Sequence, residues 1–351
     1  KQPLPIPRWI FRRSAGAHYL TGKGGFVVTT EQLLEQYMDE RQALGFVGKT
    51  DRDCIRRFLQ DYENPEDGNV EFTKEYVLGH IGNRLNQKAS TVQREASAIN
   101  GFLDFVIRKG FTAYKVPRRS LPKQIRNFKA YIFSDDEIER MLNAADYIPP
   151  TEQNPLRHHQ LPVMFRILFN CGLRSAELRE LRVGDVDLAK NTLTIRDTKF
   201  HKNRIVPFSD SVADALTKYL EVLSPRSGEM LLFPSPARRG KCGAYGATWL
   251  QVQFQYLLSH ANIPYFGAGR GPRPHDTRHT FAVHCLNSWV RSGEDLTAAL
   301  PVLSRYLGHA GIRGTQNYLQ LTAQMYPDIT ARLEEQFGDL IPESEVLHED
   351  G

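Results

Sequence analysis

The stretch between Asp104 and Ser134 contains no acidic residue, yet it carries eight basic side chains and two prolines. Helical patterning precedes this stretch, and a mixture of helical and strand patterning follows it. At 351 residues the chain is long enough to bury two separate cores. We therefore predict two domains joined by a basic linker over residues 114–132. A solvated basic loop is the alternative interpretation of this stretch.

The first domain is predicted to be a bundle of helices. Residues 1–28 mix Pro, Gly and aromatic residues without periodicity, which indicates an irregular arm. Within 29–113, apolar residues recur at helical spacing, as in Leu33, Leu34 and Tyr37. Four helices are expected: one from Thr29, one opened by a capping box of Thr50 and Asp53, one over 73–85, and one from near Ser90.

Residues 133–327 are predicted to form a second, mixed domain. Ser134 precedes three acidic residues, an arrangement typical of the start of a helix. Alternation over 192–197 and 204–208, separated by the polar turn 200–203, predicts a β-hairpin. Further helices are expected over 161–171 and 176–181, from Asp210, near Thr248, and over 277–289. The predicted fold class is mainly α with a small β-hairpin.

Charge is unevenly distributed along the chain. The 45 basic and 40 acidic side chains give a formal charge of +5, but residues 333–351 hold seven acids and no Lys or Arg. Without that segment, 45 basic residues face 33 acidic ones, a formal charge of +12. A body this basic favours a polyanionic partner.

The cysteines and the hydropathy indicate where the protein works. Cys54, Cys171, Cys242 and Cys285 are widely scattered and form neither a CxxC pair nor a disulfide framework. No apolar run approaches the roughly 20 residues that a membrane span requires. We therefore expect a cytoplasmic protein with no membrane partner.

Three polar clusters and a tyrosine follow one another in the second half of the chain. They are Gly-Leu-Arg-Ser-Ala-Glu-Leu at 172–178, Pro-His-Asp-Thr-Arg-His-Thr at 274–280, Leu-Gly-His at 307–309, and Tyr318. Displacement at a phosphodiester builds negative charge on the nonbridging oxygens. Arginine suits that charge because its planar fork donates two parallel hydrogen bonds and stays protonated. Arg174 and Arg278 are therefore candidates for a phosphate clamp, with Glu177 close enough in sequence to orient Arg174.

The remaining polar side chains fit the same chemistry. His275 and Arg278 are three residues apart, so they share one face of a helix that is expected to begin near Asp276. Tyr318 is a candidate nucleophile. Since a phenol titrates near a pH of about 10, it needs nearby arginines or a base to react at neutral pH.

A metal or a nucleotide would require other patterns. His275, Asp276 and His279 could bind a metal, but no matching set of ligands appears at ligand spacing elsewhere. His279 and His284 are interpreted as core or surface residues. The glycine-rich stretch 267–271 lacks the Gly-Lys-Ser/Thr of a nucleotide-binding loop, so it indicates a flexible loop. We expect neither a metal nor any other cofactor.

These motifs resemble those of the tyrosine recombinases of the phage integrase family. The resemblance is carried, in the family's order, by Gly-Leu-Arg-x-x-Glu-Leu at 172–178, His-x-x-Arg at 275–278, Leu-Gly-His at 307–309 and Tyr318. It covers about 133–330, and it is weaker over 29–113, which resembles the helical core-binding domain of the family. The resemblance implies a helical domain that clamps DNA and a mixed α/β catalytic domain.

The resemblance also implies a role for each catalytic residue. Tyr318 attacks the scissile phosphate and forms a 3′-phosphotyrosyl link, with release of a 5′-hydroxyl. Arg174 and Arg278 hold the nonbridging oxygens, and His309 hydrogen-bonds one of them. His275 helps to accept the proton of the tyrosine.

A lysine in a β-hairpin turn donates the proton that the leaving oxygen needs in this family. Residues 198–207 resemble that hairpin and contain two lysines. We assign the role to Lys199, because it ends the first strand, and Lys202 is its competitor. The bulky pair Phe200 and His201 departs from the small or polar residues common in this turn.

The function implied by the resemblance is site-specific recombination of double-stranded DNA. Four protomers would assemble on two sites, with accessory DNA-bending proteins as further candidate partners. Residues 328–351 are predicted to form an acidic C-terminal tail, in which a helix at 328–341 would dock on a neighbouring subunit. Packing of that helix on its own domain is the alternative. DNA contacts are expected from the basic linker and the hairpin, at Arg118, Arg119, Lys123, Arg126, Lys202 and Arg204. A type IB topoisomerase and a noncatalytic DNA-binding protein are the rival interpretations.

Overall fold

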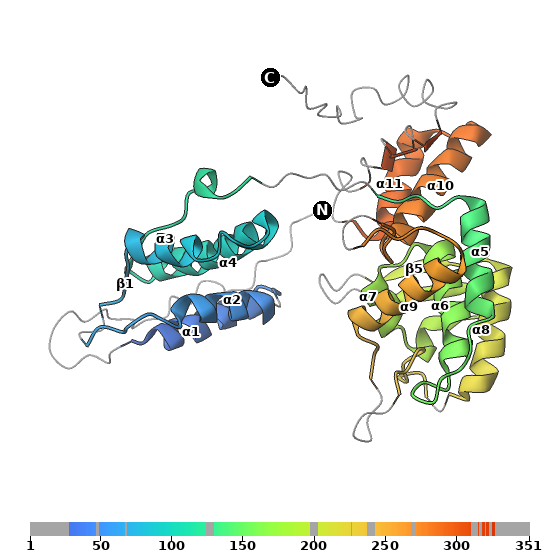
Figure 1. The fold of residues 1–351 in the computed structure, drawn as a ribbon, viewed down its shortest axis with the longest axis horizontal. Helices are drawn as coiled ribbons and strands as arrows, with labels where there is room; N and C mark the ends of the chain where they lie inside the picture. The colour runs from blue at the N-terminus through green and yellow to red at the C-terminus, as the bar shows by residue number, and fades with distance from the viewer. Residues whose placement is uncertain are drawn as a thin grey trace, which may run out of the picture. The chain divides into compact units, whose positions relative to one another are not determined.

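The chain divides into two compact units in the computed structural model, Lys1–Arg126 and Asn127–Gly351 (Figure 1). The structure describes residues 28–46, 49–66, 69–123, 130–196, 203–225, 227–236, 243–267 and 271–309, together with 315, 318, 319, 321, 322, 325 and 326. Each unit has an apolar core of its own.

The first unit packs four helices around one apolar core within its described residues. They are α1 (Thr30–Ala43), α2 (Lys49–Leu59), α3 (Lys74–Gly82) and α4 (Ala89–Arg108), with a short parallel pair β1 (Glu71–Phe72) and β2 (Thr112–Ala113). α1 starts at a capping box: the Gln32 amide donates to Thr29 Oγ1 over 3.3 Å, and the Thr29 amide donates to Gln32 Oε1 over 2.9 Å. The predicted helical bundle is confirmed.

Two predicted helix ends in this unit are wrong. α2 begins at Lys49, so Thr50 lies inside the helix and is not its cap. An N-cap residue has an extended backbone, whereas Thr50 already belongs to the first turn. α3 ends at Gly82 rather than at residue 85, and glycine is a poor residue for continuing a helix because it loses the most conformational freedom.

The predicted linker is partly packed onto the two units. Val116 is buried in the first core, and Asn100 exchanges two hydrogen bonds of 2.9 Å with its backbone. The Gln93 amide donates to the carbonyl of Pro122 over 2.7 Å. At the other end, Ala130 and Ile132 join an apolar cluster of the second unit. Residues 114–123 are therefore packed on the first unit and residues 130–132 on the second, because apolar side chains of each stretch join the core of that unit.

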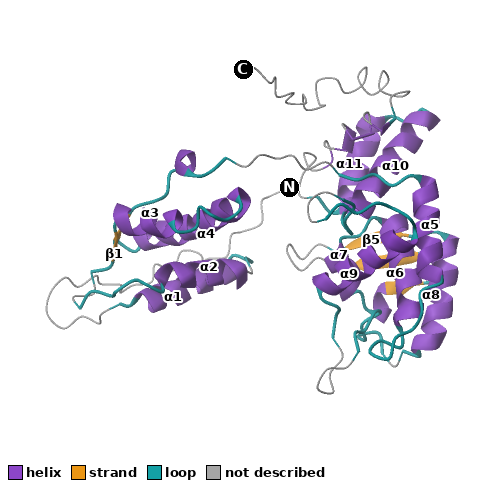
Figure 2. Ribbon diagram, viewed as in Figure 1, coloured by secondary structure: helices purple, strands orange, loops and turns teal. Residues whose placement is uncertain are grey.

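The second unit is mainly helical with a small sheet, as Figure 2 shows. Its helices are α5 (Asp135–Asp146), α6 (Arg157–Cys171), α7 (Ser175–Glu180), α8 (Asp210–Leu223), α9 (Ala247–His260), α10 (Asp276–Ser292) and α11 (Leu296–Leu307). α6 contacts α5, α8 and α10, and most of its side chains are buried. None of the described helices is long and apolar enough to cross a membrane.

The sheet confirms the predicted hairpin and adds a strand. β4 (Thr192–Ile195) pairs antiparallel with β5 (Arg204–Pro207), with Ile195 opposite Arg204, and β3 (Val186–Asp187) extends the sheet beyond β4. Leu193 and Val206 form a buried pair on the inner face of the hairpin. Strand β3 is too short to show the alternation on which the prediction depended.

α11 lies in a segment where no helix was predicted. Pro301 lies inside this helix, and a proline removes one backbone donor from the ladder of hydrogen bonds. Burial of Leu296, Leu300, Leu303 and Leu307 outweighs that loss. The helix packs against α10.

Candidate active site

The polar clusters meet where four helix ends come together in the second unit. These are the C-terminal end of α6 at Gly172, the start of α7 at Arg174, the start of α10 at His275, and the end of α11 at Gly308. Gly172 has φ 58°, and a Cβ there would lie 2.5 Å from Cδ1 of Phe281 on α10. The glycine therefore permits both the left-handed end of α6 and its close approach to α10.

Arg174 is held from two sides but remains accessible. Its Nη1 donates to Glu177 Oε1 over 2.7 Å, and its Nη2 donates to the carbonyl of Gly308 over 2.7 Å. The backbone amide of Arg174 donates to the other oxygen of Glu177 over 2.9 Å. The side chain is still 39% exposed, so an anion can reach it. The prediction that Glu177 orients Arg174 is confirmed.

Arg278 is almost completely buried and holds two of these helix ends together. It is 1% exposed, and its Nη1 donates to the carbonyl of Gly172 over 2.9 Å while its Nη2 donates to the carbonyl of Leu307. Burial and the nearby Arg174 charge lower its pKa to about 10. At neutral pH the guanidinium therefore remains charged.

His309 follows directly from the cap of α11. Gly308 has φ 66°, and the backbone amide of His309 bonds the carbonyl of Ser304 over 3.0 Å. Nδ1 of His309 lies 2.9 Å from Oγ1 of Thr315, a fully buried hydroxyl. Burial, with Arg278 and Arg174 next, lowers the pKa of His309 to about 4. The neutral ring can donate through Nε2 if the Thr315 hydroxyl donates to Nδ1.

Tyr318 is buried in the same cluster. It is 4% exposed, and its ring stacks with that of His309 at an angle of 16° and a centroid distance of 6.0 Å. Burial raises the pKa of Tyr318, while the charge of Arg278, a hydrogen bond from it, and the charge of Arg174 oppose that rise. Both arginines therefore lie close enough to stabilise a phenolate.

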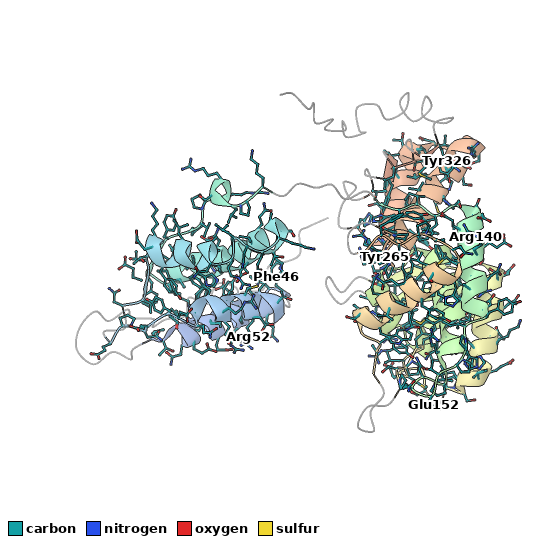
Figure 3. The ribbon with its side chains drawn as sticks, viewed as in Figure 1. Phe46, Arg52, Arg140, Glu152, Tyr265 and Tyr326 are labelled. Atoms are coloured by element: carbon teal, nitrogen blue, oxygen red, sulfur yellow. The ribbon has the colours of Figure 1, made fainter. Side chains whose placement is uncertain are left out.

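The other nearby tyrosines lie in different surroundings. Tyr306 stacks on Phe281 at 5.3 Å against the apolar core, and burial raises the pKa of its phenol. Tyr326 lies beside Arg291, whose guanidinium carbon is 5.9 Å from the centre of the tyrosine ring. Figure 3 labels Tyr326 near the ends of α10 and α11. Tyr306 meets the arginine cluster through its backbone carbonyl, which accepts from Arg204 over 2.8 Å, whereas the ring of Tyr318 stacks with that of His309.

His275 and His279 form a pair of imidazoles at the start of α10. Their rings meet edge to face at 4.8 Å, and His279 also lies 5.5 Å from the ring of Tyr318. Burial lowers the pKa of His275 to about 4, with smaller contributions from His279 and Arg278. Burial likewise lowers the pKa of His279 to about 4. Both rings are therefore neutral at pH 7, the state in which a histidine can accept a proton.

Arg204, a predicted DNA contact, lies within the arginine cluster. Its side chain is 13% exposed. Nη1 and Nη2 donate to the two oxygens of Glu177 over 2.9 and 2.7 Å, and Nε donates to the carbonyl of Tyr306 over 2.8 Å. All three guanidinium nitrogens of Arg204 therefore donate within the cluster. The strand pattern alone could not show this contact with a distant glutamate.

Three of the other predicted DNA-binding residues belong to the first unit. Arg118, Arg119 and Lys123 are exposed in the first unit. Lys199, Lys202 and Arg126 lie outside the described residues. The segment 197–202 is flanked by the described ends of β4 and β5, and the second of these begins at Arg204.

Two further residues of the site were not singled out by sequence. Thr315 was overlooked, although its place three residues before Tyr318 puts both on neighbouring turns if the segment is helical. His279 was interpreted as a core or surface residue, yet its spacing of four from His275 was a usable signal. In the described part of the chain, no group of three or more His, Cys, Asp or Glu side chains could hold a metal ion.

The arrangement suits attack on a phosphodiester. Three guanidinium groups, three neutral imidazoles and a phenol converge, and the backbone carbonyls that accept from the arginines lie at helix ends. Such preorganised donors stabilise charge that develops on nonbridging oxygens without rearranging during the reaction.

Comparison with known proteins identifies the family to which this site belongs. The sequence pattern described as "Phage integrase family" matches residues 132–325, more than half of the chain. The chain belongs to the phage integrase family. As a member it is a tyrosine recombinase that acts on DNA. The predicted family and the predicted fold class are confirmed.

Relatives in the phage integrase family align over most of the chain. A putative integrase/recombinase of Sinorhizobium fredii, y4rB, is 29% identical over 320 residues, 89% of this chain and 99% of that protein. Tyrosine recombinase XerD of Pseudomonas aeruginosa is 26% identical over 319 residues, 86% of this chain and 96% of that protein. A crystal structure of XerH site-specific recombinase bound to palindromic difH substrate has a TM-score of 0.57 at 17% identity, covering 87% of this chain and 85% of that chain. That likeness supports the fold.

Proposed function

We propose that the chain cleaves and rejoins duplex DNA with Tyr318 as its nucleophile. The phenolic oxygen attacks the scissile phosphorus and forms a 3′-phosphotyrosyl bond, while the bond to the 5′-oxygen breaks. The phenol loses one proton and the leaving 5′-oxygen gains one, so the reaction consumes no cofactor. The supporting observation is that the ring of Tyr318 lies 6.0 Å from that of His309 and 5.5 Å from that of His279, while Arg174 stays open to an anion.

Each neighbouring side chain has a role in this reaction. Arg174 and Arg278 hold the nonbridging oxygens, which gain charge as the phenol attacks. His309 donates a hydrogen bond to one of these oxygens, with Thr315 fixing its tautomer. His275 accepts the phenolic proton, and the arrival of a negatively charged phosphate raises the pKa of this histidine from its depressed value. Lys199 is the proposed proton donor to the leaving oxygen, by the family resemblance.

The proposed partner is duplex DNA that carries a specific recombination site. The XerH structure holds difH DNA, and a lambda integrase(75-356) structure is a dimer bound to a core site. For this chain we propose four protomers on two sites, with accessory DNA-bending proteins as further partners. Exposed Arg118, Arg119 and Lys123 are proposed to contact phosphates, which would make binding strongly dependent on salt.

The test is the capture of the covalent intermediate. A duplex enriched from a random library by repeated binding to the whole chain is nicked at successive positions, so that the released fragment diffuses away after cleavage. Wild type should form a denaturation-resistant protein–DNA complex. Tyr318→Phe should form none while binding the same duplex with an unchanged Kd, and Tyr326→Phe should behave as wild type.

The outcomes separate the rival functions. Joined products from two copies of the selected duplex support recombination. Relaxation of a supercoiled plasmid without joined products would instead indicate a topoisomerase. Tight binding with no phosphotyrosine in the wild-type chain would indicate a noncatalytic DNA-binding protein and overturn the proposal.

A further inference from the structure

We infer that Arg204 is a positioning residue for the cleavage reaction: by neutralising Glu177, it leaves the charge of Arg174 available to the scissile phosphate. The inference rests on the proposed function and adds to it a residue that touches neither the phosphate nor the nucleophile. It follows from the contacts of Arg204, from the charges around Glu177, and from the packing at Gly308.

The end of α11 serves as a template for three arginines. Arg204 donates to the carbonyl of Tyr306, Arg278 to that of Leu307, and Arg174 to that of Gly308. These consecutive carbonyls lie at the negative end of the helix dipole, where cations are favoured. Each arginine takes one acceptor, so the three guanidinium groups are fixed relative to one another.

Glu177 is shared between two of these arginines. Its Oε1 accepts from Arg174 over 2.7 Å and from Arg204 over 2.9 Å, and its Oε2 accepts from Arg204 over 2.7 Å. Burial raises the pKa of Glu177, but Arg204 first and Arg174 next outweigh burial, so the pKa is lowered and the group is a carboxylate at neutral pH. Three cations and one anion leave two net positive charges in the cluster.

Removing Arg204 changes what Arg174 can do. The single negative charge of Glu177 would then be balanced by Arg174 alone, and the pair would be close to neutral. One net positive charge, that of Arg278, would remain to attract a phosphate. Because Glu177 is only 13% exposed, water would screen this change weakly.

The guanidinium of Arg204 also packs closely against Gly308. A Cβ on Gly308 would lie 3.1 Å from Nη1 of Arg204 and 3.5 Å from Nη1 of Arg174. Since Arg204 is the first residue of β5, its bonds also connect that strand to the end of α11. The guanidinium therefore fills the space between the hairpin and the helix end from which His309 follows.

The experiment measures formation of the phosphotyrosine bond in single-turnover reactions on the library-selected, nicked duplex. Arg204→Met should cleave roughly 10- to 100-fold more slowly than wild type, the scale seen when a partner that orients a metal ligand is lost, with an unchanged Kd for the duplex. Arg204→Lys keeps the charge and should be closer to wild type. Arg166→Met is the matched control, because Arg166 forms a bidentate ion pair with Asp146 outside the site. Its Nη1 and Nη2 donate to Oδ1 and Oδ2 of Asp146 over 2.6 and 2.7 Å.

A compensating variant distinguishes charge from structure. In Arg204→Met with Glu177→Gln, the cluster regains two net positive charges, so cleavage should be faster than in Arg204→Met alone. A merely structural role predicts that the double variant is at least as slow as the single one.

Three results would overturn the inference. They are a cleavage rate for Arg204→Met equal to that of the Arg166→Met control, no gain in Arg204→Lys over Arg204→Met, and no gain in the double variant. If wild type itself forms no phosphotyrosine, the proposed function fails, and that result is separate because it requires no variant.

Discussion

Replacing Gly308 by alanine tests whether the end of α11 aligns the arginine cluster. Gly308 has φ 66°, and an L-residue in this left-handed conformation costs about 1–2 kcal/mol. Gly293 at the end of α10 has φ 77°, and nothing lies within 4 Å of a Cβ built there. Alanine thus carries the same conformational cost at both positions, but only at Gly308 does its Cβ also meet Arg204 and Arg174.

The expected results for stability and for cleavage differ. Gly308→Ala and Gly293→Ala should each destabilise the protein by about 1–2 kcal/mol, a fall in Tm of about 2–8 °C at 2–4 °C per kcal/mol. In Gly308→Ala the new methyl lies 3.1 Å from Nη1 of Arg204, so the guanidinium groups must shift by a few tenths of an ångström. Misplacement on this scale should slow cleavage roughly 10-fold, whereas Gly293→Ala should keep the wild-type rate.

The assay pairs thermal unfolding with single-turnover formation of the phosphotyrosine bond at a temperature below both transitions. Equal losses of stability with a loss of cleavage only in Gly308→Ala would support the alignment role. If both variants cleave at the same rate, the close packing of Gly308 against the arginines does not matter to the reaction, and the reasoning fails.

Two further predictions concern the histidines. Thr315→Val removes the hydroxyl that faces Nδ1 of His309 and should slow cleavage roughly 5-fold, the value of one neutral hydrogen bond of about 1 kcal/mol. Single-turnover rates check this against Thr217→Val on α8, which should have no effect, and equal rates in the two variants would contradict it. His275, His279 and His309 have folded-state pKa values lowered to about 4, below the ordinary 6.5, so the unfolded chain binds more protons between these values. Stability from these groups is therefore present above pH 6.5 and is lost as the pH falls toward 4. The Tm should fall over this window, and less steeply in His279→Asn; an unchanged slope in that variant would refute the assignment.

Local spacing predicted the parts of the site that lie on one element. Arg174 and Glu177 are three residues apart at the start of α7, and His275 and Arg278 flank the start of α10 in the same way. In a helix such pairs must be neighbours, so their contact follows from sequence. The hairpin was predictable for a similar reason, since two segments of alternating apolar and polar residues joined by a polar turn commonly form a β-hairpin.

What could not be predicted depends on contacts between distant elements. The acceptors of Arg278 are the carbonyls of Gly172 and Leu307, more than a hundred residues and 29 residues away, and backbone acceptors leave no trace in side-chain patterns. α11 was missed because Pro301 argues against a helix when its four buried leucines are not known to face a core. Helix propensity read from the local sequence predicts a helix poorly where burial of side chains stabilises it.

Arg204 shows why a basic residue on a hairpin is an ambiguous signal in a DNA-binding protein. Net charge favours interpreting each exposed cation as a phosphate contact, but Glu177 has two oxygens and cannot be satisfied by Arg174 alone once it is buried. A carboxylate placed to orient a catalytic arginine therefore requires a second cation, or it would neutralise the charge that it positions. Arg179, the basic residue within α7, donates instead to the carbonyls of Ser175 and Tyr245, so the second cation comes from another element. In this chain the first residue of β5 supplies it.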